Sequence, residues 1–244
     1  MRRKLTYFLI VLSIFLVTTA FTSNEKISGE KILSKMYKKY KGNWHKTFTF
    51  TQNTVQYKND TIARKSIWYE TIVYPDYFRI SFGDPKDGNA VLFIRDSTFN
   101  FAKGKLTGKS KRGEDLTFLL GGMYFLPFDS ILVKMKGEGY DISKAFEIDK
   151  EGKGFFVIGA NNSDEKLNQL WIDKDKLLVA KFIKYDGNSK EEAVFFNHKK
   201  FGKAWAETAC RFFVNDKLIQ TETYTDCKAN TAVDMGIFDV GNFK

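Results

Sequence analysis

The chain has 244 residues and a formal net charge of +10, and 43% of its residues are hydrophobic. This length suffices for one large β-rich domain or two small ones around a substantial core. Only 3 Pro occur against 24 Phe, 11 Tyr and 4 Trp, a composition that favours strands and apolar pockets. The two His stand alone, at positions 45 and 198, so the sequence gives no argument for a metal site or another cofactor.

The first 20 residues have the order of a secretory signal peptide. Positive residues at 2–4 precede an apolar run from Phe8 to Val17, and small residues follow at 18–20. The run is shorter than the about 20 residues that a membrane span needs, and no Cys follows it to carry a lipid. We expect cleavage near Ala20 and a soluble, exported, periplasmic protein. Its positive charge then points to an anionic surface or to solubility rather than to nucleic acid.

The mature chain, 21–244, has the pattern of one helix followed by many strands. Residues Ser28 to Tyr40 predict an amphipathic helix that Ser28 can cap and Gly42 can end. Short connections between the strands predict antiparallel neighbours. About eleven strands without a clear linker predict one domain, a strongly curved sheet or an incomplete barrel. The expected strands are 46–57, 62–74, 77–83, 89–95, 98–103, 154–160, 167–173, 177–186, 191–200, 203–214 and 217–227.

The two cysteines are expected to remain free thiols, although export makes a disulfide possible. Residues 203–214 and 217–227 predict a hairpin that turns at Asn215-Asp216. In that register Cys210 faces about Thr221, and Cys227 lies six residues further along, roughly 20 Å away. A disulfide cannot bridge such a distance.

An apolar stretch separates the two series of strands. Residues Asp115 to Phe128 are almost wholly apolar and are interrupted by Gly121-Gly122 and Pro127. Residues Asp129 to Lys136 predict a short helix with Asp129 as its cap. We expect short helices and loops over one face of the sheet. They either plug the core or form a movable lid, since paired glycines and a Pro leave few regular hydrogen bonds.

No catalytic motif stands out. The stretch GKLTGKS, from Gly104 to Ser110, has three residues between its glycines where a P-loop needs four, and we interpret it as a hairpin loop. Carboxylates are scattered between residues 141 and 165, with no spacing that favours a glycosidase pair. The basic span 103–112 is either a solvated tip or a docking patch for anionic lipid or an acidic partner.

Aromatic residues recur on alternate positions of the expected strands. Phe48 and Phe50 share one face of their strand, and similar pairs follow along the chain. One curved sheet with few helices to cover it favours an apolar cleft, whereas a filled core uses the same residue types. The other rings of this pattern are Trp68, Phe78, Phe82, Phe99, Phe101, Trp171, Phe182, Phe195, Trp205 and Phe212.

Five short motifs follow one another along the chain: FTFTQ (48–52), VYPDYFRISFG (73–83), FIRDSTFNFAKGK (93–105), LLGG (119–122) and QLWIDKDKLLVAKFIKYD (169–186). Their order resembles the LolA-like family, the periplasmic carriers of outer-membrane lipoproteins and their relatives. The resemblance covers most of the mature chain. It implies an unclosed antiparallel β-barrel with an N-terminal helix and lid helices over an apolar cavity for acyl chains. Carriers of this family often have a basic residue before the Pro of the second motif, where this chain has Tyr74. Arg79 matches the Arg that the family has in the following strand.

The leading hypothesis is therefore a monomeric, non-enzymatic carrier of lipid or lipoprotein acyl chains, with receptors at the inner or outer membrane. The alternatives are a lipid-sensing or protein-interaction module on the same fold and, third, a secreted hydrolase. The expected cavity residues are Phe48, Phe50, Trp68, Phe78, Ile80, Phe82, Phe99, Phe101, Phe118, Leu119, Phe125, Trp171 and Phe182. The expected docking residues are Tyr74, Arg79, Lys103, Lys105, Lys109, Lys111 and Arg112.

Overall fold

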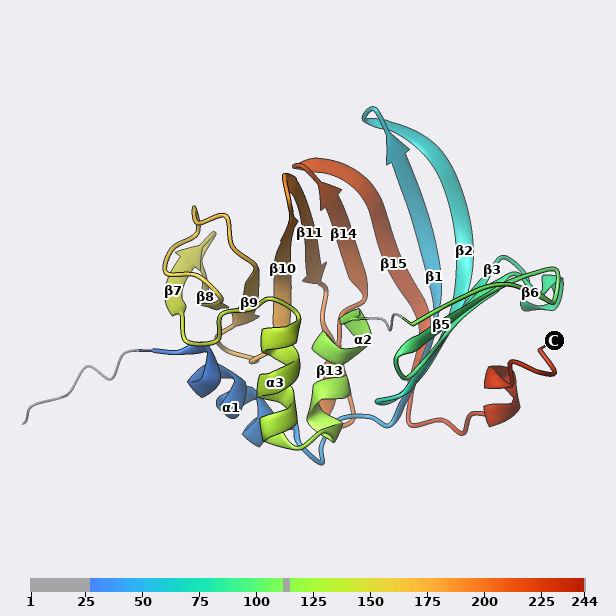
Figure 1. The fold of residues 1–244 in the computed structure, drawn as a ribbon, viewed down its shortest axis with the longest axis horizontal. Coiled ribbons are helices and arrows are strands. Elements are labelled where there is room, and N and C mark those ends of the chain that lie inside the picture. The colour runs from blue at the N-terminus through green and yellow to red at the C-terminus, as the bar shows by residue number, and fades with distance from the viewer. Residues whose placement is uncertain (1–26, 112–114, 244) are drawn as a thin grey trace, which may run out of the picture.

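The computed structural model describes residues 27–111 and 115–243, so the expected signal peptide and Arg112 lie outside the described residues. Thirteen strands form one open antiparallel sheet, which curves around a layer of short helices (Figure 1). The predicted unclosed, strongly curved sheet is confirmed. The helices are α1 Gly29–Tyr40, η1 Pro85–Asp87, α2 Asp115–Leu119, η2 Gly122–Phe125, α3 Phe128–Gly137 and η3 Met235–Phe238.

The sheet has the order β6-β5-β4-β3-β2-β1-β15-β14-β11-β10-β9-β8-β7, and β12 and β13 form a separate two-stranded sheet. Its first strand in the sequence, β1, pairs with its last, β15, at the middle of the sheet. The strands are β1 Thr47–Lys58, β2 Thr61–Val73, β3 Tyr77–Phe82, β4 Ala90–Ile94, β5 Ser97–Ala102, β6 Lys105–Ser110, β7 Ala145–Lys150, β8 Lys153–Ile158, β9 Gln169–Asp173, β10 Val179–Asp186, β11 Ser189–Phe196, β12 Lys199–Phe201, β13 Ala204–Ala206, β14 Ala209–Val214 and β15 Lys217–Ala229.

Each of the eleven expected strand segments contains a strand, and the differences have local causes. The predicted hairpin loop Gly104 to Ser110 is wrong for most of its length, because residues 105–110 pair with β5 and form the edge strand β6. Only the turn at Lys103 and Gly104 remains, where both residues have positive φ. The expected strand 203–214 is divided, since β13 pairs with β12 whereas β14 joins the large sheet.

Helix α1 forms as the sequence predicts. The Lys31 amide donates to Ser28 Oγ at 3.4 Å, which caps the helix, and Tyr40 is its last residue. Its apolar face is buried against the concave side of the sheet, toward β8, and against α3 and η2. The Tyr37 hydroxyl donates to Leu126 O at 2.9 Å, which ties α1 to the connection between η2 and α3.

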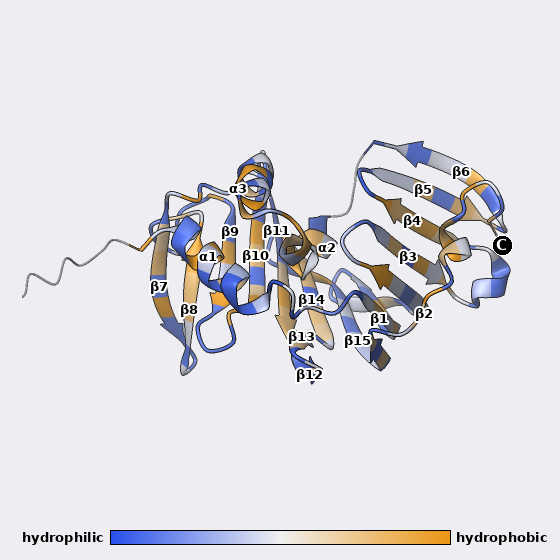
Figure 2. Ribbon diagram, turned by 90° about the horizontal axis from the view of Figure 1, so that it is seen from below, coloured by the Kyte–Doolittle hydropathy of each residue, from blue (hydrophilic) through white to orange (hydrophobic). Residues whose placement is uncertain are grey.

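Helix α3 begins earlier than expected. Pro127, not Asp129, occupies the position before the helix, and no side chain caps it. The carboxylate of Asp129 lies in the first turn instead, where it still suits the positive end of the helix dipole. The hydropathy view shows α1, α2 and α3 on the same side of the sheet (Figure 2). The expected layer of short helices is confirmed in this position.

The apolar residues pack into two clusters, one on each face of the sheet. The larger lies between the helices and the concave face and includes Phe48, Leu119 and Met135. The smaller lies on the other face, where Leu92 and Phe101 pack against Phe238 of the C-terminal segment. Cys210 and Cys227 are free thiols, as expected. Within 27–111 and 115–243, none of the helices has the length and apolar character needed to cross a membrane.

The paired glycines at the start of η2 serve close packing. Gly121 has φ +154°, and a Cβ added there would lie 2.1 Å from Nε1 of Trp44. The Trp44 ring also packs 4.8 Å from the Tyr124 ring, between centroids. The backbone of η2 can approach the indole this closely only because Gly121 has no side chain.

We therefore expect Gly121→Ala to lower the free energy of unfolding by about 1–3 kcal/mol, because the methyl group displaces the Trp44 indole. The measurement is urea unfolding followed by Trp fluorescence. Gly137→Ala is the control, since an added Cβ there meets no atom within 4 Å. Equal stability of both variants would contradict the packing role of Gly121.

Candidate functional site

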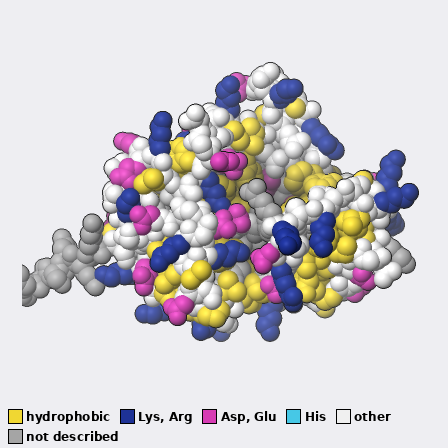
Figure 3. Space-filling model, viewed as in Figure 1, with side chains coloured by type: hydrophobic (Ala, Val, Ile, Leu, Met, Phe, Trp, Pro, Cys, Tyr) yellow, Lys and Arg dark blue, Asp and Glu magenta, His cyan; other side chains and the backbone are white. Residues whose placement is uncertain are grey.

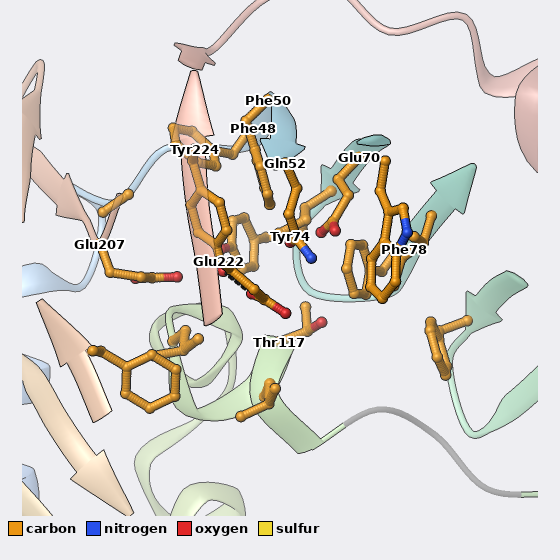
Figure 4. Close-up of a pocket in the computed structure, with 18 of the residues that line it drawn as sticks. Phe48, Phe50, Gln52, Glu70, Tyr74, Phe78, Thr117, Glu207, Glu222 and Tyr224 are labelled. Atoms are coloured by element: carbon orange, nitrogen blue, oxygen red, sulfur yellow. Dashed lines mark hydrogen bonds between the residues drawn. The ribbon is translucent and has the colours of Figure 1, made fainter. Parts of the chain in front are cut away.

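An apolar cavity of about 190 Å³ lies between the concave face of the sheet and α2. The space-filling view shows hydrophobic side chains gathered around a hollow on this side of the molecule (Figure 3). Its lining residues come from both halves of the chain (Figure 4): Phe48, Phe50, Gln52, Trp68, Glu70, Ile72, Tyr74, Phe78, Ile80, Phe93, Leu116, Thr117, Leu120, Phe195, Ala206, Glu207, Phe212, Glu222 and Tyr224.

The alternation of β1 decides which of its side chains reach the cavity. Phe48, Phe50 and Gln52 all lie on the concave face. The rings of Phe48 and Phe50 have centroids 5.4 Å apart, and Phe50 packs 4.4 Å from Tyr224 of β15. The FTFTQ stretch therefore supplies part of the cavity wall together with the last strand of the chain.

Helix α2 separates this cavity from a second hollow. Leu116 and Thr117 of α2, with Leu120, line the first cavity. On the other side of α2 lies a second hollow of about 490 Å³, and the two share Phe93, Leu116 and Phe212 as lining residues. A displacement of α2 would join the two spaces.

One lysine holds the start of α2 in place. Lys184 of β10 donates from Nζ to Asp115 Oδ2 at 3.0 Å and to Glu138 Oε2, after α3, at 2.7 Å. Asp115 is the first residue of α2, so this ion-pair cluster fastens α2 to the sheet and to the end of α3.

Three carboxylates face the apolar cavity. Glu70 and Glu222 are only 5% and 6% exposed, and Glu207 lies in the connection between β13 and β14 (Figure 4). Glu222 accepts hydrogen bonds from Gln220 Nε2 at 2.6 Å and from the Tyr224 hydroxyl at 2.7 Å. Among the described residues, no Lys, Arg or His lines this cavity. Glu207 and Glu222 therefore lie in a weakly polar part of the cavity wall.

This environment favours the protonated acids. The pKa of Glu207 is raised to about 7, because burial raises it most and the nearby Glu222 also raises it, whereas a hydrogen bond from its own backbone opposes the shift. Burial also raises the pKa of Glu222, although hydrogen bonds from Tyr224, Gln220 and Gln52 oppose the shift. A neutral Glu207 can donate a hydrogen bond into the cavity, which an ionised carboxylate cannot do.

The expected cavity residues fall into three groups. Five of them line the cavity: Phe48, Phe50, Trp68, Phe78 and Ile80. Leu119 and Phe182 line the second hollow, whereas Phe118 is buried in the core, Phe125 stacks on Tyr74, and Phe82 packs against Trp68.

The remaining three expected cavity residues lie on the opposite face of the sheet. Phe99 and Phe101 pack in the smaller cluster with the C-terminal segment. Trp171 packs with Phe155, and its indole donates to Gln169 Oε1 at 3.0 Å. Successive side chains of a strand point to opposite faces of the sheet. These three rings occupy the strand positions that point away from the cavity.

The expected docking residues do not form one surface. Tyr74 is buried and lines the cavity, whereas Arg79 lies on the convex face of β3. Lys103, Lys105, Lys109 and Lys111 are exposed along the edge formed by β5 and β6. Lysines on an edge strand also discourage pairing with other chains, which is a structural reason for their presence.

Sequence reasoning did not find the acidic side of the cavity. Glu70 and Glu222 occupy strand positions of the same parity as their apolar neighbours Ile72 and Tyr224. A carboxylate on the apolar face of an alternating strand is the signal that could have located them. Glu207 lies between strands, and no sequence pattern marks it.

Neither histidine forms part of a metal site within the described residues, and these contain no cluster of three metal-ligating side chains. His45 is buried between the Trp44, Phe48 and Tyr74 rings, and burial lowers its pKa to about 4. It therefore packs as a neutral aromatic ring.

Comparisons with known proteins show the fold. No family model matches the sequence, and no curated protein matches it either. Among solved structures, a putative outer membrane lipoprotein-sorting protein domain from Vibrio parahaemolyticus aligns with a TM-score of 0.61 at 14% identity, covering 87% of this chain and 97% of that one. A DUF1329 family protein from Desulfovibrio piger aligns with a TM-score of 0.60 at 14% identity, covering 88% and 98%.

A LolA superfamily protein from Nitrosomonas europaea aligns with a TM-score of 0.54 at 10% identity, covering 88% of this chain and 99% of that one. These likenesses extend over nearly the whole length of each neighbour. The chain therefore has the LolA-like fold, which confirms the fold that the sequence motifs implied.

The raised pKa of Glu207 predicts a pH-dependent loss of stability. Because its folded-state pKa lies above the usual 4.5, the contribution of Glu207 to stability falls as pH rises from about 4.5 to about 7 and changes little beyond. Glu207→Gln removes this loss. From pH 5 to pH 8, we expect the free energy of unfolding of the variant to increase by about 1–3 kcal/mol relative to that of wild type. The measurement is urea unfolding at both pH values.

The matched control is Glu151→Gln, an exposed residue in the turn between β7 and β8. It should leave the difference between pH 5 and pH 8 as in wild type. The same pH dependence in wild type and Glu207→Gln would contradict a protonated Glu207.

Proposed function

We propose that the protein is an exported, periplasmic carrier that shields the acyl chains of a lipid or lipoprotein in its cavity. The observation that carries this proposal is the apolar cavity on the concave face, covered by the short helix α2. The LolA-like fold and the lipoprotein-sorting description of one structural neighbour support it. The proposal assigns no catalytic step to the chain.

The energetics of an acyl chain match a covered cavity. Each buried methylene contributes about 0.8 kcal/mol, so a sixteen-carbon chain represents on the order of 10 kcal/mol and leaves into water slowly. A carrier must therefore shelter the chain without a tight fit and release it to a receptor with equal shelter. Walls of Phe side chains and a five-residue lid helix suit this requirement.

The size of the cavity implies that α2 moves when a chain enters. About 190 Å³ lies below the 300–1,000 Å³ typical of small-molecule pockets, so the closed cavity holds only part of a long chain. Displacement of α2 would add the second hollow of about 490 Å³. Opening then requires the ion pairs of Lys184 to break.

The carboxylates give the cavity a polar region that can contact the polar part of the proposed ligand. A protonated Glu207 can donate a hydrogen bond to the carbonyl oxygen of an acyl ester or amide. Glu70 and Glu222 lie on neighbouring walls of the same cavity. We propose that they orient the polar linkage of the ligand, while the rings of Phe48, Phe50 and Phe78 contact its chains.

A sensor or interaction module on the same fold is the second candidate. Tyr74 replaces the basic residue that the lipoprotein carriers of this family often have before the Pro, and its side chain is buried against Phe125. In that case the exposed lysines of β5 and β6 would bind a receptor or an anionic surface, and filling the cavity would leave this binding unchanged.

The deciding experiment is native mass spectrometry of the protein purified from its own periplasm, with lipid extraction of the same sample. We expect a stoichiometric acyl lipid or acylated polypeptide. A ligand-free mass together with no uptake of a fluorescent fatty acid would overturn the carrier function and favour the interaction module.

Filling the cavity should abolish acyl binding. We expect Ile80→Trp to weaken binding of a fluorescent fatty acid at least tenfold, because the indole occupies space that the chain needs. Val133→Trp is the matched control, since Val133 lies 71% exposed on α3 and does not line the cavity. Equal binding by both variants would place the ligand outside the cavity.

Releasing α2 should speed entry of the probe. Lys184→Met removes both ion pairs and leaves Asp115 and Glu138 side by side, so we expect several-fold faster association in stopped-flow fluorescence. The control is Lys190→Met, because Lys190 also lies between two carboxylates, Glu192 and Asp216, on a hairpin away from α2. An unchanged rate in Lys184→Met would show that α2 does not gate the cavity.

A further inference from the structure

A second concave site lies on the convex side of the sheet, opposite the apolar cavity. It is an open groove of about 560 Å³ whose floor is formed by alternate residues of β2 and β3. One wall is η1 and the other is the C-terminal η3. The lining residues are Tyr69, Thr71, Arg79, Ser81, Pro85, Lys86 and Ile237.

The central feature of this groove is a buried arginine. Arg79 is only 7% exposed, and no described carboxylate forms an ion pair with it. A buried charge without a counter-ion is costly, so such groups are normally paired. Within residues 27–111 and 115–243, the charge of Arg79 is therefore not balanced by an acidic side chain.

The guanidinium is held in a fixed position. Its Nε donates to Ser81 Oγ at 3.0 Å, and its Nη1 donates to the backbone oxygen of Ile237 at 3.0 Å. The ring of Phe243 lies 4.7 Å from its central carbon. These contacts use two of the five N–H groups and fix the plane of the guanidinium before any ligand arrives.

The other polar side chains of the groove are also hydrogen-bond donors. Tyr69, Thr71 and Ser81 supply hydroxyl groups, and Lys86 supplies an exposed ammonium group. None of the described residues that line the groove is an acid. The nearby Asp84 is engaged as the cap of η1, where it accepts from the Lys86 amide at 2.9 Å.

We propose that this groove binds a phosphoryl group, with Arg79 and Lys86 neutralising its charge. A tetrahedral phosphate presents oxygens in several directions, which suits two cations and three hydroxyl groups around one concave surface. A planar carboxylate would satisfy the Arg79 fork alone. The site is independent of the acyl cavity, because the two lie on opposite faces of β3.

The phosphoryl group can belong to a soluble phosphate monoester or to a phospholipid headgroup. Two exposed apolar side chains, Ile67 and Tyr69, lie on the same face of β2 next to the groove. They would contact an apolar portion attached to the phosphate. The two sources share the same recognition chemistry and are separated by the experiment.

The test measures binding of inorganic phosphate and glycerol 3-phosphate by isothermal titration calorimetry. A second arm measures co-sedimentation with phosphatidylcholine vesicles that contain phosphatidylglycerol. The first variant is Lys86→Gln, which changes an exposed side chain and should not disturb folding. The second is Arg79→Lys, which keeps the positive charge but loses the planar guanidinium. The control is Lys217→Gln, an exposed lysine at the start of β15 and outside the groove.

We expect saturable binding in at least one arm, weakened about fivefold by Lys86→Gln and about tenfold or more by Arg79→Lys, with Lys217→Gln unchanged. Binding of the soluble phosphates assigns the site to a phosphate monoester, whereas binding to vesicles alone assigns it to a lipid headgroup. No binding in either arm, or an equal loss in Lys217→Gln, would overturn the proposal. Cooperative thermal unfolding of Arg79→Lys checks that the C-terminal segment stays packed.

Discussion

The pairing of β1 with β15 is the contact on which the rest of the molecule depends. It joins residues 164 or more positions apart, such as Gln56 with Gln220, at the middle of the sheet. Each half of the sheet otherwise consists mostly of sequential hairpins. Without this ladder the two halves would have no shared concave face, and the cavity would lose its floor. Because loop closure over such a distance is costly, the apolar contacts across this pair must compensate for it.

The same pairing also brings together the polar side of the cavity. Gln52 of β1 lies beside Glu222 and Tyr224 of β15, and all three face the hollow (Figure 4). Burying carboxylates among Phe rings costs stability unless they are protonated or hydrogen-bonded. The pKa values of Glu207 and Glu222 are raised, which favours their protonated, neutral forms. Under the proposed function, these polar groups would also contact the polar part of the ligand.

Strand β3 lies between the apolar cavity and the convex groove, and its alternation serves both. Phe78 and Ile80 line the cavity, whereas Arg79 and Ser81 form the floor of the groove. The C-terminal segment covers the neighbouring convex surface and fixes the Arg79 guanidinium through Ile237 and Phe243. Occupants of the two sites would therefore contact opposite faces of one short strand, without sharing a side chain.

The sequence by itself determined the local structure of this protein. Periodicity located α1 and the expected strands, and hairpin register kept Cys210 and Cys227 apart, because these signals depend on neighbours along the chain. It also placed Phe48 and Phe50 on one face. Only the tertiary structure decided which face is concave, and so why Phe93 reaches the cavity while Phe99 and Phe101 pack under the C-terminal segment. Alternation defines two faces of a strand, but curvature and distant segments decide what each face meets. For the same reason the gathering of Glu70, Glu207 and Glu222 could not be predicted, since three separate elements bring them together.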